Sequence, residues 1–131
     1  MNGNGVVLIV DDHALLARSL VSLLSAAGFD AQAVHSGAEA LAFLRGDTAV
    51  ALILLDMSMP DMSGVEVLRA IRAPGGDSHS PPIVMFSADD DPGTRDELIQ
   101  LGATGFVSKS NPGGLLRAVS AYVRPTRPPG A

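Results

Sequence analysis

The chain has 131 residues, 47% of them hydrophobic, which is enough for one domain with a substantial buried core. It contains no cysteine, and this excludes disulfides, thiolate nucleophiles and cysteine-based zinc sites and favours a reducing, cytoplasmic location. A formal net charge of −5 without a Lys/Arg cluster argues against nucleic-acid binding, and the lack of an apolar run near the ~20 residues of a membrane span predicts a soluble protein.

Strand and helix signals alternate from the start of the chain. Val6–Val10 is an apolar, β-branched run that ends abruptly at Asp11, as a strand buried on both faces would. A helix is expected next, ending at Gly28, which suits a left-handed cap, and Phe29–Val34 is the second predicted strand. The apolar residues of this helix recur at spacings of three and four and are Leu16, Leu20, Leu23, Leu24 and Ala27.

The same pattern continues through the middle of the chain. A Ser-x-x-Glu capping box predicts a helix over residues 36–44, which Gly46 closes. Ala51–Leu55 is a second fully apolar run, and it ends at Asp56. Another capping box over residues 63–66 opens the third helix. The residues of this helix that are expected to face the sheet are Val67, Leu68 and Ile71.

Residues 73–82, rich in Gly, Ser and Pro, are predicted to be a loop. Ile83–Phe86 is the next strand and ends at Ser87. Asp91-Pro92 supplies a cap and a first-turn proline for a helix that runs to about Leu101.

Phe106–Val107 is the last predicted strand, with Thr104 as an alternative start, and it ends at Lys109. Asn111 opens the final helix, which Pro125 must terminate. One face of this helix carries Leu115, Leu116, Val119 and Val123.

Five strands alternating with five helices through right-handed crossovers predict a doubly wound parallel sheet in a single α/β domain. We expect this domain to span residues 6–123. It would follow a disordered N-terminus at residues 1–5 and precede a linker or C-terminal tail at residues 124–131.

Chemically useful side chains stand directly after four of the predicted strands: Asp11 with Asp12, then Asp56, Ser87 and Lys109. Ligands bind outside the carboxyl ends of the strands in such sheets, so these side chains should meet at one edge. Three carboxylates gathered there would repel one another unless a cation neutralised them. Magnesium suits such a site, since it accepts a few carboxylates and completes its shell with waters and phosphate oxygens.

An Asp carboxylate is also a nucleophile toward phosphorus, and attack by Asp56 would form an acyl phosphate. Lys109 can supply an ammonium group that stabilises the transferring phosphoryl oxygens. The hydroxyl of Ser87 can donate a hydrogen bond to the same group, and the small neighbour Ala88 leaves room for it.

Together with the stretch Leu-Leu-Asp-Met-Ser-Met-Pro-Asp-Met-Ser-Gly at residues 54–64, these residues resemble the receiver domains of bacterial two-component response regulators. The resemblance covers roughly residues 6–123. It implies a flavodoxin-like (βα)5 fold with strand order 2-1-3-4-5 and a role in phosphorelay signalling. The phosphoryl donor would be a sensor histidine kinase or a histidine phosphotransfer protein.

Carried over by position, the resemblance implies that Asp56 is the phosphoacceptor and that Lys109 binds the phosphoryl group. Asp11 and Asp12 would be the acids of the magnesium site, with Asp12 the more direct ligand. The backbone carbonyl of Ser58 would be a further metal ligand. The domain would not be an enzyme in the usual sense, but it would assist its own phosphorylation and dephosphorylation.

The resemblance also implies a switch, in which Ser87 moves toward the phosphoryl group and the rotamer of Phe106 changes. The surface formed by the fourth helix, the last strand and the last helix would then control an output domain or a homodimer. Two departures from the family pattern bear on this expectation. Ser110 stands after Lys109 where the family usually has proline, and Phe106 lacks the hydroxyl of the more familiar tyrosine.

Several alternatives remain open at this stage. A haloacid-dehalogenase-like phosphatase also uses an Asp nucleophile and magnesium, but it requires a second Asp where Ser58 stands. A degenerate receiver would bind a partner without phosphorylation, and a nucleotide-binding module would need a Gly-rich loop after the first strand. In the alternative interpretations of these residues, Asp11 or Asp12 only caps the following helix, and Phe106 is ordinary core. His13 is expected to point to solvent.

Overall fold

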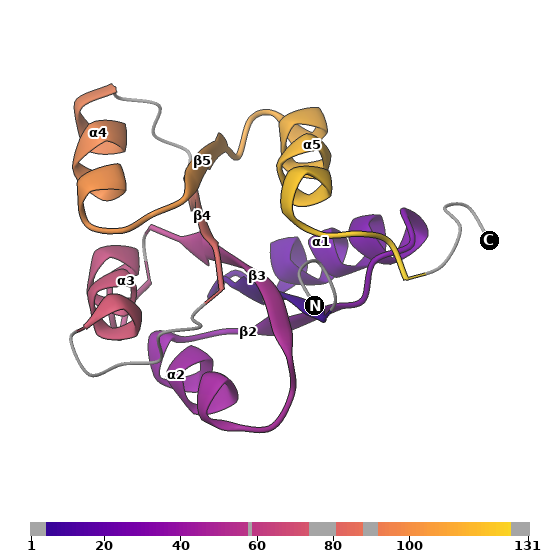
Figure 1. The fold of residues 1–131 in the computed structure, drawn as a ribbon, viewed down its shortest axis with the longest axis horizontal. Helices are drawn as coiled ribbons and strands as arrows, with labels where there is room; N and C mark the ends of the chain where they lie inside the picture. The colour runs from indigo at the N-terminus through magenta and orange to yellow at the C-terminus, as the bar shows by residue number, and fades with distance from the viewer. Residues whose placement is uncertain (1–4, 58, 74–80, 88–91, 127–131) are drawn as a thin grey trace.

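The computed structural model describes residues 5–57, 59–73, 81–87 and 92–126 (Figure 1). Predictions that concern residues 1–4, Ser58, the loop residues 74–80, Ala88, Asp91 and 127–131 lie outside this part of the chain. Strands and helices alternate as predicted, and their bounds are β1 Val6–Val10, α1 Ala14–Ala26, β2 Ala31–Val34, α2 Gly37–Arg45, β3 Val50–Asp56, α3 Gly64–Arg72, β4 Ile83–Ser87, α4 Pro92–Gln100, β5 Gly105–Ser108 and α5 Pro112–Tyr122.

The five strands form one parallel sheet in the order β2-β1-β3-β4-β5, which confirms the predicted fold. The register sets Val10 beside Leu55 and Asp56 beside Phe86. The carboxyl ends of β1 and β3 therefore lie next to each other at the centre of the sheet, where the strand order reverses. Such a reversal opens the crevice in which doubly wound sheets bind their ligands.

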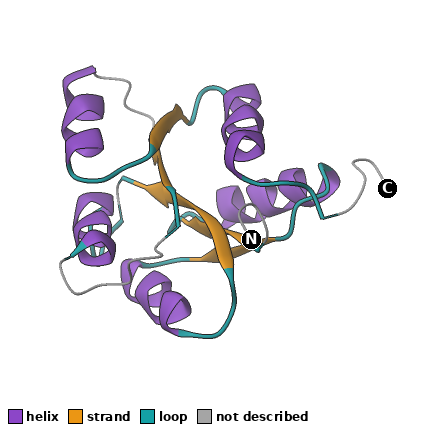
Figure 2. Ribbon diagram, viewed as in Figure 1, coloured by secondary structure: helices purple, strands orange, loops and turns teal. Residues whose placement is uncertain are grey.

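Helices cover both faces of the sheet, because alternate residues of each strand point to opposite sides (Figure 2). α1 and α5 pack on one face and α2, α3 and α4 on the other. The strand residues under α1 and α5 include Val7, Ile9, Leu52, Leu54, Val84 and Phe86. Those under the other three helices include Leu8, Val10, Ile53, Leu55, Ile83 and Met85.

Several element boundaries differ from the predictions, most of them by one residue. The second strand begins at Ala31 rather than Phe29, because the backbone N–H of Phe29 donates to Leu24 and completes the end of α1. Gly28, with φ of 96°, makes the left-handed turn that this helix end requires. The side chain of Phe29 is still 2% exposed, so its hydrophobicity reflects core packing outside the strand. The last strand, Gly105–Ser108, extends one residue beyond each end of the predicted strand Phe106–Val107.

The helix starts follow the predicted capping chemistry. Ser63 accepts a hydrogen bond from the N–H of Glu66, whose carboxylate accepts from the N–H of Ser63, so the capping box is complete. Ser36 caps α2 by accepting from the N–H of Glu39, whose carboxylate accepts from the N–H of His35 instead of Ser36. Asn111 caps α5 by accepting from the N–H of Gly114.

Beyond α5 the chain returns to α1. Both the backbone N–H and the hydroxyl of Thr126 donate to the carbonyl oxygen of Gly28, at 2.8 and 3.2 Å. The first residues after the last helix are thus attached to the end of α1. Within the described ranges, no helix combines the length and the apolar character that a bilayer crossing requires.

Candidate functional site

Three carboxylates meet at the carboxyl edge of the sheet. Asp11 and Asp12 follow β1, and Asp56 is the last residue of β3. One oxygen from each of the three side chains lies within 4.8 Å of the others. Asp11 is fully buried and Asp56 is 4% exposed, while Asp12 lies at the surface. The structure thus brings together the three acids that the sequence predicts to share a site.

Asp11 is held by the segment around it. Its Oδ1 accepts a hydrogen bond of 2.9 Å from the backbone N–H of His13, and its own N–H donates to the carbonyl of Val34. Among the described residues, the Oδ2 of Asp11 is a buried side-chain oxygen that accepts no hydrogen bond. A buried carboxylate oxygen in this condition is energetically unfavourable without a neighbouring cation.

Lys109 brings positive charge to the acids. Its Nζ lies 3.0 Å from Oδ1 of Asp56 and 3.6 Å from Oδ2 of Asp11, and it stands 5.5 Å from the centre of the Phe86 ring. The backbone N–H of Lys109 donates to the carbonyl of Ser87 at 2.8 Å. The peptide bond between Lys109 and Ser110 is trans.

The two residues predicted to take part in a switch lie on the neighbouring strands. Ser87 ends β4, is 7% exposed and pairs with Ser108 in the sheet register. Phe106 is half-buried in β5, and the guanidinium carbon of Arg95 in α4 lies 5.1 Å from the centre of its ring. Phe106 therefore packs against the core on the α4 side of the sheet and also lies beneath a cation of α4.

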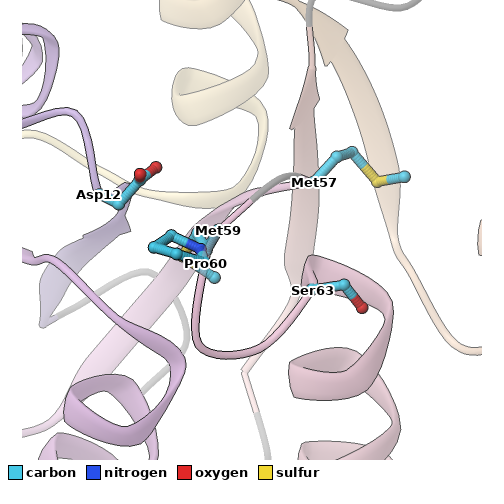
Figure 3. A pocket seen from close by; sticks show the side chains of 5 residues that line it. All are labelled: Asp12, Met57, Met59, Pro60 and Ser63. Atoms are coloured by element: carbon cyan, nitrogen blue, oxygen red, sulfur yellow. The ribbon is translucent and has the colours of Figure 1, made fainter.

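An open pocket of about 460 Å³ lies beside the acids. Figure 3 shows Asp12 on one side and Met57 and Ser63 on the other, with Met59 and Pro60 between them. This pocket leaves the exposed acid of the cluster accessible to a ligand from solvent.

Three residues near the site were not recognised from their sequence pattern. His13, expected only to face solvent, is exposed but also caps α1, since its Nδ1 accepts from the N–H of Leu16. The cap of α1 is therefore His13, and not Asp11 or Asp12. His35 lies with its Nδ1 3.1 Å from the backbone oxygen of Asp11.

Asp61 is the third. Its two carboxylate oxygens accept hydrogen bonds of 3.3 Å from the N–H groups of Gly37 and Ala38, at the start of α2. Loss of solvent contact alone would raise the pKa of Asp61, but backbone hydrogen bonds, from Ala38, Gly37 and Met62 among others, outweigh it and hold the pKa below its usual value. No local sequence pattern signals this contact, because the partners are more than 20 residues apart.

The donor set fits a hard dication. All three acids present oxygen, the ligand atom that magnesium prefers, and the Oδ2 of Asp11 is a buried acceptor without a hydrogen-bond donor. Lys109 neutralises one of the three negative charges, which leaves the cluster with an excess that an ion would balance.

Comparison with known proteins agrees with this geometry. The family model of the response regulator receiver domain matches residues 7–120. The DNA-binding response regulator MtrA of Mycobacterium tuberculosis is 37% identical over 121 residues, and the transcriptional regulatory protein CpxR of Klebsiella pneumoniae is 34% identical over 119 residues. Each alignment covers 90% of this chain but only 50% and 49% of the relative, so the chain spans about half the length of these proteins.

Solved structures show the same likeness. The chemotaxis protein CheY4 of Vibrio cholerae is 30% identical with a TM-score of 0.80, over 91% of this chain and 98% of that one. The response regulator TrrA of Thermotoga maritima, in complex with Mg(2+)-BeF, is 28% identical with a TM-score of 0.73, over 90% and 97%. With its parallel sheet and its buried acids at the sheet edge, the chain belongs to the receiver domain family of two-component response regulators.

Proposed function

We propose that this receiver domain accepts a phosphoryl group on Asp56 from a phosphohistidine donor, with Mg²⁺ bound by Asp11, Asp12, Asp56 and the backbone carbonyl of Ser58. The observation that carries the proposal is the pairing of the 4%-exposed Asp56 with the ammonium of Lys109 at 3.0 Å, beside two further carboxylates. A buried acid with this surrounding charge is suited to phosphoryl transfer.

In the reaction, one carboxylate oxygen of Asp56 attacks phosphorus while the P–N bond to the donor imidazole breaks. The product is an acyl phosphate, and the electron pair leaves with the imidazole. When bound, Mg²⁺ supplies positive charge that offsets the carboxylates and the phosphoryl oxygens. Lys109, already beside Oδ1 of Asp56, is near enough to pair with a phosphoryl oxygen on that atom.

The same groups would assist hydrolysis of the acyl phosphate, so the domain promotes both its own phosphorylation and its dephosphorylation. Water can approach from the open side, where Asp12 lines the pocket. The lifetime of the signal then depends on how well the neighbouring loops exclude that water.

Output would pass through Ser87 and Phe106. The hydroxyl of Ser87 would hydrogen-bond the new phosphoryl group, and Phe106 would change rotamer on the α4-β5-α5 surface. Support comes from the hydrogen bond that joins the backbone of Lys109 to Ser87, and from the packing of Phe106 beneath Arg95 on that surface. A homodimer or an output domain is the expected reader of this surface, and the relatives that are twice as long include DNA-binding regulators.

The primary test is intact mass after incubation with acetyl phosphate and Mg²⁺. The wild type should gain one acid-stable, base-labile phosphoryl group, and Asp56→Asn should gain none. Lys109→Gln should be phosphorylated far more slowly. If the wild type stays unmodified even with a phosphorylated histidine protein, the proposal fails, and phosphorylation-independent binding of a partner becomes the better account.

The switch has its own test. Amide chemical shifts of Ser87, Phe106 and their neighbours should move on addition of beryllofluoride and Mg²⁺, which together mimic the phosphoryl group. The shifts in Asp56→Asn should stay in place. Unchanged shifts around Phe106 in a wild type that binds the analogue would refute the switch while leaving phosphorylation intact.

A further inference from the structure

Asp61 joins two elements that border the candidate metal site. It lies in the loop from β3 to α3, and its Oδ1 and Oδ2 accept from the consecutive N–H groups of Gly37 and Ala38. These are among the first N–H groups of α2, which have no acceptor within the helix. A carboxylate is well matched to this position, because the helix dipole is positive here.

The start of α2 is also attached to β1. The ring of His35 lies 3.1 Å from the carbonyl oxygen of Asp11, and the N–H of Asp11 donates to Val34 at 3.1 Å. Val34 and His35, which lead into α2, thus contact Asp11, and the first turn of α2 contacts the loop that carries Asp61. The segment from Val34 to Ala38 therefore links the residue after β1 to the middle of this loop, in addition to the direct pairing of β1 with β3.

The loop has firm attachments at its base. The N–H of Met57 donates to Phe86 at 3.3 Å, and the N–H of Gly64 donates to Met57 at 2.9 Å. Gly64 lies so close to the backbone of Asp56 that an added Cβ would be 2.3 Å from its carbonyl oxygen. These contacts hold the start and the end of the loop, while Asp61 holds its middle against α2.

We propose that Asp61 is a positioning residue for Mg²⁺: its carboxylate braces the β3–α3 loop against α2 and so holds the loop wall of the pocket at the right distance from Asp12. The inference rests on the proposed function, because it presupposes Mg²⁺ at Asp11, Asp12 and Asp56, beside the pocket that this loop lines. Asp61 directly follows Pro60, which lines the pocket together with Met59. Without the brace, the loop would sample more positions and bind the ion less well.

The test is a Mg²⁺ titration followed by amide chemical shifts, on the wild type and on Asp61→Ala. The half-saturating Mg²⁺ concentration should rise about three- to tenfold in Asp61→Ala, the effect of losing interactions that are weak individually. Asp61→Asn keeps one acceptor oxygen, so its half-saturating Mg²⁺ concentration should lie between those of the wild type and Asp61→Ala. The exposed Asp47→Ala, which removes the same charge outside the candidate site, should behave as the wild type.

Two further readouts separate positioning from other causes. In about 0.5 M NaCl, exposed charges are screened. The ratio of the half-saturating Mg²⁺ concentrations of Asp61→Ala and the wild type should nevertheless stay the same. Phosphorylation by acetyl phosphate should need more Mg²⁺ in Asp61→Ala, yet reach within about twofold of the wild-type rate at saturation, since the loss is in metal affinity.

The outcomes are distinguishable. Equal half-saturation in Asp61→Ala and the wild type overturns the brace while the proposed function stands. The rise in half-saturating Mg²⁺ concentration would be due to charge alone if it disappeared in about 0.5 M NaCl, or if it were as large in Asp61→Asn as in Asp61→Ala. Either outcome also overturns the positioning role of Asp61. A wild type that never saturates with Mg²⁺ refutes both this inference and the metal site on which it rests.

Discussion

Asp11→Asn should make the metal-free protein more stable. Asp11 is fully buried, and its charge has two opposing contacts. At an effective dielectric constant of about 20, the attraction to Lys109 across 3.6 Å amounts to about 4.6 kcal/mol, and the repulsion from Asp56, which has an oxygen within 4.8 Å, to at least about 3.5 kcal/mol. Asp12 is exposed and adds roughly 1 kcal/mol of repulsion in a water-like medium.

These pair energies nearly cancel, so the desolvation of the buried charge decides the sign. Burial of an ionised carboxylate costs several kcal/mol, and burial of an amide costs less. The amide oxygen of Asn can still accept from the N–H of His13, as Oδ1 of Asp11 does at 2.9 Å. We therefore expect Asp11→Asn to raise the free energy of unfolding by about 1–3 kcal/mol without metal, which corresponds to at least about 3 °C in Tm.

The assay is urea unfolding in EDTA, repeated with saturating Mg²⁺. Ligand at about 100 times its Kd stabilises a folded protein by about 2.7 kcal/mol. Mg²⁺ should therefore raise the free energy of unfolding more in the wild type than in Asp11→Asn. Asp47→Asn, an exposed acid outside the site, should stay within about 0.5 kcal/mol of the wild type. An Asp11→Asn variant that is less stable than the wild type in EDTA would refute the reasoning.

Three further predictions concern the framework of the site. Gly64→Ala should destabilise the fold by about 1–3 kcal/mol in urea unfolding, because its Cβ would meet the Asp56 carbonyl at 2.3 Å; Gly113→Ala, where the nearest atom is at 3.7 Å, is the control and should cost clearly less. Leu54→Ala, at a 1%-exposed position, should cost about 2–5 kcal/mol, and a loss below about 1 kcal/mol would contradict the packing described. Because the folded-state pKa of Asp61 is lowered, its stabilising contribution is present above its usual pKa of 3.8 and is lost as pH falls through the folded-state value; the stability difference between the wild type and Asp61→Asn should shrink on acidification, and a difference independent of pH would contradict this.

The fold could be predicted from the sequence because its signals are local. Unbroken apolar runs such as Val6–Val10 mark strands buried on both faces, and glycines and capping boxes mark helix ends. The prediction that the second strand begins at Phe29 was wrong for a local reason too, since a buried apolar residue can belong to a helix end as well as to a strand. Hydrophobicity reports burial, and hydrogen bonding decides where the strand begins.

The meeting of Asp11, Asp12, Asp56 and Lys109 was predictable for a different reason. All parallel strands end at one edge, so the topology alone brings their following residues together. The contacts of Asp61 with α2 depend instead on how a loop folds across a helix start. The capping-box pattern at one partner and the loop motif at the other do not indicate that the two meet, so only the three-dimensional arrangement reveals the contact.

The bonds from Thr126 to Gly28 also have a consequence for protein engineering. α1 runs back from the acidic edge, so Gly28 lies at the opposite edge of the sheet. A reporter or an effector fused after Thr126 would start about one strand length, roughly 20 Å, from Asp56. An extended linker adds at most about 3.6 Å per residue, so the attachment point of the fused protein can reach Asp56 only with about six or more linker residues.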